Sequence, residues 1–215
     1  MESIPVNGNC DSRFLEIKAI FSEAIKSGHE LGASIAIEYE GEMVVNLYGG
    51  HKDENREKPW QQNTWVNVFS VTKAVTAVCI AKLIEDGKLD FNEKVSTYWP
   101  EYGKNGKENT LVSDFLCHRA GMFGFTEGIP SSNWTEWTKY TKVLEEQKPL
   151  REPGKSQGYH ALTYGWLVGE IIKRIDGRSV GKFFHEEIAI PSKIDFKIGL
   201  GQEDFSKCAD MIMME

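Results

Sequence analysis

A serine and a lysine stand one helical turn apart in the segment FSVTK, at Ser70 and Lys73. They open residues 70–86, a run that is apolar nearly all round and therefore predicts a buried helix, which Gly87 ends. Residues three apart on a helix share a face, so the two side chains can touch. The free N–H groups and positive dipole at the helix start favour an alkoxide on Ser70, and with burial they disfavour the charged form of Lys73. A serine beside such a lysine is an activated nucleophile with its base.

Plainer interpretations of this and similar patterns must be weighed. Ser70 could only cap the helix while Lys73 extends to the surface. The segment Gly177-Arg178-Ser179-Val180-Gly181 matches the nucleophile elbow G-x-S-x-G, but a helix rather than a strand precedes it. A helix C-cap at Gly177 and an N-cap at Ser179 account for that match more simply. Lys26-Ser27-Gly28 lies at the end of a predicted helix, where glycine again serves as a C-cap.

Three segments, FSVTKAVTA, LIEDGKLD and LCHRAGM, together resemble the serine β-lactamase-like family. That family includes class C β-lactamases, penicillin-binding DD-peptidases, related esterases and eukaryotic β-lactamase-domain proteins. The resemblance runs from about Leu31 to about Leu200. In the family the serine of S-x-x-K is acylated and the lysine assists proton transfer. The resemblance therefore implies that Ser70 is the nucleophile and that Lys73 is its proton-transfer partner.

A second family motif, Tyr-x-Asn, has its counterpart at Tyr159-His160-Ala161. The resemblance implies that Tyr159 is a tyrosine base across the cleft. Ala161 stands where β-lactamases carry an asparagine that contacts the substrate, which argues against β-lactam hydrolysis and is common in esterase-like members. His118 is expected to position the loop near the nucleophile, and His160 is expected to reach the cleft. Neither histidine is predicted to act as a base.

A third family motif, Lys-Thr-Gly or His-x-Gly, donates one N–H of the oxyanion hole and is not found after Tyr159. The chain ends at Met214-Glu215, before that motif would be expected. We therefore predict that residues 1–215 form a single β-lactamase-related domain truncated at its C-terminus.

The secondary-structure pattern predicts an α+β fold. Helical spacing over residues 12–27 is followed by two strands, GASIAIEY and EMVVNLYGG, that form a hairpin. A long helical region comes next, with further predicted helices at 131–148, 163–176 and 179–188, the last ending before Pro191. The expected architecture is the β-lactamase/transpeptidase-like one, a helical lobe plus an antiparallel sheet that is incomplete in this chain. Two strands leave their edges open, so we expect self-association through those edges.

Composition excludes several classes of protein. The 215 residues carry a net charge of −7 and no basic stripe, which argues against a nucleic-acid partner. No apolar run approaches the ~20 residues that span a bilayer, and no signal peptide is recognisable, so no membrane association is expected. Four scattered cysteines predict a reduced, cytoplasmic (intracellular) protein. The five histidines fit no metal pattern, and neither a metal nor another cofactor is expected.

These observations predict a serine hydrolase that cleaves an ester or amide through an acyl-enzyme on Ser70. Lys73 and Tyr159 would transfer protons, and the partner would be a small-molecule or peptide-like acyl substrate. The alternative is a truncated, non-catalytic β-lactamase-domain protein that lacks the third motif.

Overall fold

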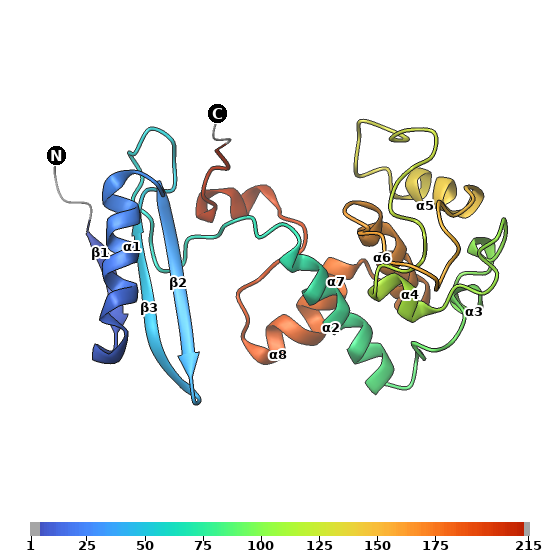
Figure 1. Cartoon of the computed structure of the whole chain (residues 1–215), viewed down its shortest axis with the longest axis horizontal. Helices are drawn as coiled ribbons and strands as arrows, with labels where there is room; N and C mark the ends of the chain where they lie inside the picture. Colours follow the sequence, from blue (N-terminus) through green and yellow to red (C-terminus); the bar gives the residue numbers. More distant parts are fainter. Residues whose placement is uncertain (1–4, 213–215) are drawn as a thin grey trace. The chain divides into compact units, whose positions relative to one another are not determined.

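The computed structural model describes residues 5–212, which form two compact units. The first contains the described residues up to Val68 and those from Leu200 onward, and the second is Phe69–Gly199. The first unit holds a small antiparallel sheet with one long helix, and the second is helical (Figure 1). This confirms the predicted α+β class, with a helical lobe and an open sheet.

The sheet of the first unit has three strands, one more than predicted. Strands β2 (Gly32–Tyr39) and β3 (Glu42–Gly50) form the expected hairpin, and β1 (Val6–Cys10) pairs antiparallel with the other side of β3. The order is β1-β3-β2. Strand β1 was not predicted because its sequence, VNGNC, is mostly polar and lacks the apolar residues at alternate positions that indicate a strand. Gly8 is required there, since a Cβ would lie 1.9 Å from the carbonyl oxygen of Asn46.

One long helix covers one face of this sheet (Figure 1). Helix α1 (Leu15–Ser27) follows a short 3-10 turn, Ser12–Phe14, and ends at Gly28, whose φ of 78° forms a left-handed cap. Its apolar residues pack against Val45 and Leu47 of β3. The helix predicted over 12–27 is therefore confirmed.

Helix α6 (Thr163–Asp176) is the buried centre of the second unit. Helices packed against it are α2 (Val71–Glu85), α3 (Val95–Tyr98), α4 (Val112–Leu116), α5 (Trp137–Glu146) and α7 (Val180–Phe184). The core that they share includes Leu83, Trp99, Phe115, Leu144, Leu167 and Ile172. The prediction of a helix over 163–176 is confirmed at both ends, with Gly177 as a left-handed C-cap.

Other helix boundaries in this unit differ from those predicted. Helix α5 begins at Trp137 rather than near 131, because residues 131–136 form turns in which Asn133 accepts hydrogen bonds from Thr135. The helical segment that begins after Ser179 does not end before Pro191, contrary to the prediction. It passes through a π-helical turn, His185–Ala189, into α8 (Ile190–Ser192), so Pro191 lies within a helical segment whose regular hydrogen bonding the π-helical turn interrupts.

Helix α2 is also less buried than its composition predicted. Val71, Val78 and Ile84 are exposed, whereas Ile80 and Leu83 face the core. The composition of a helix shows how apolar it is but does not determine how many other elements pack around it, so an apolar helix can remain partly exposed. Among residues 5–212, no helix is both long and apolar enough to cross a membrane.

Candidate active site

Ser70 stands immediately before α2 with its hydroxyl available for chemistry. It is the N-cap residue of α2, but its side chain makes no capping hydrogen bond and its backbone is helical, with φ −74° and ψ −8°. Phe69, the preceding residue, has a φ of 45°, a conformation that is strained for an aromatic residue. The interpretation of Ser70 as a simple helix cap therefore does not fit its geometry.

The Ser70 hydroxyl accepts two hydrogen bonds. Lys73 Nζ donates to Ser70 Oγ at 3.0 Å, which is the contact expected from their spacing on one helical turn. Tyr159 is far from Ser70 in the sequence, and its hydroxyl donates to the same oxygen at 2.6 Å. The structure thus brings together all three residues predicted from the sequence, Ser70, Lys73 and Tyr159.

The charge of Lys73 acts on the tyrosine. The pKa of Tyr159 is lowered, first by its hydrogen bond with Ser70, and further by hydrogen bonding with Lys73 and by the ammonium charge. Lys73 Nζ lies 5.0 Å from the centre of the Tyr159 ring, within the range of a cation–π contact. Tyr159 is 55% exposed, so a substrate can reach its hydroxyl.

Tyr164, in the first turn of α6, also lies at the site, although no sequence motif indicates it. Its hydroxyl donates to the carbonyl oxygen of Lys73 at 3.3 Å, and its ring centre lies 5.8 Å from Lys73 Nζ. The lysine ammonium is therefore flanked by two tyrosine rings. No local sequence pattern marks Tyr164, because only the packing of α6 on α2 brings it to the site.

Two histidines lie behind Tyr159. The ring of His118 meets that of Tyr159 edge-on at 4.8 Å, and His118 Nδ1 accepts a hydrogen bond from the backbone N–H of His160 at 3.1 Å. The prediction that His160 reaches the cleft is wrong, since it is 0% exposed. Its Nε2 accepts from the N–H of Met122 at 3.2 Å, and burial lowers its pKa to about 4. His160 is therefore held inside by the hydrogen bond that its ring accepts from Met122 and by the one that its backbone N–H donates to His118.

Other serine patterns in the sequence have structural roles. The Ser179 hydroxyl accepts from the N–H of Lys182 and caps α7, and Gly177 is the left-handed cap of α6. Ser27 and Gly28 form the end of α1. The nucleophile elbow and the upstream Lys-Ser-Gly therefore match helix boundaries, as predicted.

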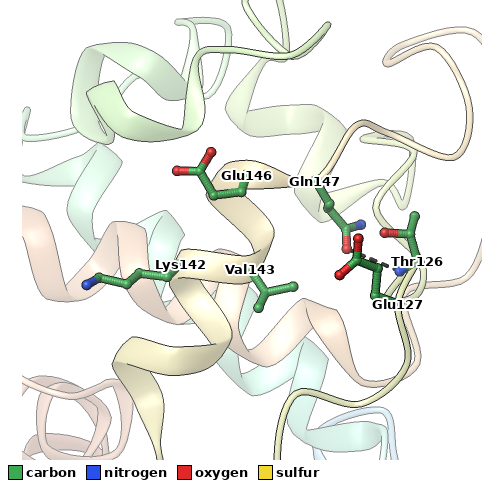
Figure 2. A pocket seen from close by; sticks show the side chains of 6 residues that line it. All are labelled: Thr126, Glu127, Lys142, Val143, Glu146 and Gln147. Carbon is green, nitrogen blue, oxygen red and sulfur yellow. Dashed lines mark hydrogen bonds between the residues drawn. The ribbon is translucent and has the colours of Figure 1, made fainter.

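A pocket of about 280 Å³ in the second unit lies beside α5 and contains none of the three candidate catalytic residues (Figure 2). Its lining residues are Thr126, Glu127, Lys142, Val143, Glu146 and Gln147. The Gln147 side chain bonds the neighbouring loop, accepting from the N–H of Thr126 and donating to the carbonyl of Gly124. That amide therefore holds the loop on α5. Within the described part of the chain, no three His, Cys, Asp or Glu side chains converge as metal ligands.

Known proteins share this arrangement of elements. A sequence profile of the family described as Beta-lactamase matches residues 17–214. The chain belongs to the beta-lactamase family. Among curated members, Esterase/beta-lactamase LipL of Mycobacterium tuberculosis (strain ATCC 25618 / H37Rv) is 32% identical over 193 residues, covering 88% of this chain and 44% of that protein.

Solved structures agree with this beta-lactamase-family assignment. A penicillin-binding protein homologue from Caulobacter crescentus superposes with a TM-score of 0.88 at 37% identity, covering 97% of this chain and 56% of that chain. A family VIII carboxylesterase superposes with a TM-score of 0.89 at 36% identity, covering 97% of this chain and 58% of that chain. The beta-lactamase-like fold expected from the sequence is thereby confirmed. The chain spans about half the length of these relatives.

Proposed function

We propose that this chain carries the nucleophilic site of a serine hydrolase that cleaves esters or amides through an acyl-enzyme on Ser70. The observation that carries the proposal is the double hydrogen bond to Ser70 Oγ, from Lys73 Nζ at 3.0 Å and from the Tyr159 hydroxyl at 2.6 Å. Such contacts between a serine and its proton-transfer groups are the geometric signature of an activated nucleophile. Family membership supports hydrolase chemistry, since one relative is named an esterase/beta-lactamase and another a carboxylesterase.

The proton path follows from the charges at the site. When Tyr159 is ionised, its phenolate oxygen can accept the proton of Ser70 as Oγ attacks the acyl carbonyl carbon. The hydrogen bond with Ser70 lowers the pKa of Tyr159 most, and hydrogen bonding with Lys73 and the lysine charge lower it further, so all three favour the phenolate. The tyrosine then returns the proton to the departing alkoxide or amine. Water completes the cycle by the reverse path, releasing the acid and restoring Ser70.

Esters fit this site better than β-lactams do. Ala161 follows Tyr159 and His160, and its methyl group offers no hydrogen-bond donor to an acylamido side chain. An activated ester has a good leaving group and needs fewer contacts to be positioned, so aryl esters of short acids are the preferred substrate class.

The proposal can be tested by covalent labelling. The purified 215-residue chain is incubated with a fluorophosphonate, and intact mass followed over time gives the rate at which one adduct forms. Ser70→Ala removes the nucleophile, Lys73→Met and Tyr159→Phe each remove one proton-transfer group, and Ser179→Ala is the matched control at a serine outside the site.

One adduct on Ser70 is expected in the wild-type chain and in Ser179→Ala, and none in Ser70→Ala. Loss of Lys73 or Tyr159 should slow labelling about 10²–10⁴-fold, the usual size of a general acid–base contribution. Labelling that persists in Ser70→Ala but disappears in Ser179→Ala would overturn the assignment. A wild-type chain that melts cooperatively yet takes no label would favour the non-catalytic alternative.

A further inference from the structure

The loop that carries Tyr159 is fastened to a second segment, residues 118–122. Backbone N–H groups of Gly154 and Gly158 donate to the carbonyls of Arg119 and His118, each at 2.9 Å. The N–H of Leu150 donates to the carbonyl of Gly121 at 2.8 Å. The Tyr159 hydroxyl can meet Ser70 only if this loop keeps one position, so these attachments determine the geometry of the site.

His118 makes the attachments nearest to Tyr159. Its carbonyl accepts from residue 158, its Nδ1 accepts from the backbone N–H of residue 160, and its ring meets the Tyr159 ring edge-on at 4.8 Å. One residue thus holds the chain on both sides of the tyrosine and contacts the tyrosine itself. The His118 ring also contacts that of Tyr164, at 5.3 Å between ring centres. Its φ of 59° is left-handed, a conformation in which histidine is several-fold enriched over most residues.

We propose that His118 is a positioning residue that holds the Tyr159 hydroxyl on Ser70 through its Nδ1 acceptor and its ring. This inference rests on the proposed function and adds to it a residue that acts through Tyr159 and does not touch the substrate. An imidazole Nδ1 that accepts a hydrogen bond carries no proton, so neutral His118 is the Nε2–H tautomer. Burial and the charge of Lys73 lower the pKa of His118, which favours this neutral form.

Two substitutions test the Nδ1 acceptor of His118 without disturbing the left-handed backbone conformation of this residue. Glycine and asparagine both tolerate the left-handed conformation, so neither His118→Gly nor His118→Asn should strain the turn. Asparagine keeps an acceptor, Oδ1, close to the place of Nδ1, whereas glycine keeps none. Small positional errors at a reacting group cost up to about 10²-fold in rate. We expect His118→Gly to slow fluorophosphonate labelling about 10- to 100-fold and His118→Asn to recover most of that loss.

A double-mutant cycle shows whether His118 acts through the tyrosine. In a Tyr159→Phe background the hydroxyl is already absent, so adding His118→Gly should change the labelling rate by less than about 2-fold. An equal loss in both backgrounds would overturn the proposal, since it would mean that His118 acts on the fold in general.

Two further measurements do not depend on activity. In the NMR spectrum of tyrosine labelled at Cζ, the pKa of Tyr159 should rise in His118→Gly toward that of an ordinary tyrosine, and unchanged titration would overturn the proposal. Imidazole ¹⁵N shifts of the unaltered chain should show the Nε2–H tautomer for His118, and an Nδ1–H tautomer would equally overturn it. If the wild-type chain takes no label, the proposed function fails, while the tyrosine titration and the tautomer still decide this inference. If His118→Gly does not melt cooperatively, the tautomer decides it.

Discussion

Replacement of His160 by glutamine should make the stability of the chain less sensitive to acid. His160 is fully buried and accepts a hydrogen bond from the N–H of Met122 through Nε2. Glutamine can place Oε1 near the same position, so His160→Gln keeps an acceptor for Met122 and removes the titrating group. The side chain fits less well, so some stability is lost at every pH, but the pH dependence isolates the protonation.

The magnitude follows from the two pKa values of His160. An ordinary histidine has a pKa of 6.5, and burial, with a smaller contribution from His118, lowers the pKa of His160 in the folded chain to about 4. Above pH 6.5 the group is neutral in both states and the folded state keeps its full advantage. As pH falls from 6.5 through 4, the unfolded chain binds the proton first, so stability decreases. At about 1.4 kcal/mol for each pH unit, the loss reaches about 3 kcal/mol by pH 4.

Urea unfolding followed by tryptophan fluorescence measures this loss at steps between pH 7.5 and pH 4. The unfolding free energy of the wild type minus that of His160→Gln should fall by about 3 kcal/mol as the pH is lowered across that range. His29→Gln, the same substitution at an exposed histidine, is the matched control. If the wild type and His160→Gln lose stability in parallel, the reasoning from burial is refuted.

Four other outcomes are expected. Gly121→Ala should destabilise the chain by about 2–4 kcal/mol in urea, because φ is 69° and a Cβ would lie 2.0 Å from the carbonyl oxygen of Arg151; wild-type stability would contradict this. Ser179→Ala should cost about 1 kcal/mol by loss of the α7 cap, with labelling of Ser70 unchanged. Because Ala161 has no side-chain amide, a chromogenic cephalosporin should be hydrolysed negligibly and a short-chain aryl ester detectably. Comparable turnover of both would exclude a preference for esters. Among residues 5–212 no strand pairs with the outer edges of β1 and β2, and we propose that these edges cause association; light scattering should then show species larger than a monomer, and a monodisperse monomer would exclude this.

Local elements of the fold could be predicted because short-range physics determines them. Helix α1, the β2–β3 hairpin and α6 each follow from periodicity within one segment and from a turn or cap signal at its end. Strand β1 could not be predicted in this way, because a polar five-residue segment becomes a strand only when β3 offers its edge. The continuation of the helical segment through Pro191 could not be predicted either, because no local pattern marks the π-helical turn that precedes the proline.

Some contacts of the site could also be predicted from local sequence, and others could not. The contact between Ser70 and Lys73 follows from a three-residue spacing on one helix, so the sequence by itself determined it. Tyr159 could be selected only through resemblance to a family motif, since nothing in its own segment marks it as a partner of Ser70.

Only the tertiary structure decided which side chains surround these three groups. It placed Tyr164 against Lys73, buried His160, and left part of the apolar surface of α2 exposed. It also joined residues 118–122 to the loop of Tyr159. The physical reason is that helix and turn propensities act over a few residues, whereas burial and long-range hydrogen bonds depend on which segments become neighbours when the chain packs. Sequence therefore determined the contact between Ser70 and Lys73, and packing determined how Tyr159 is held on them.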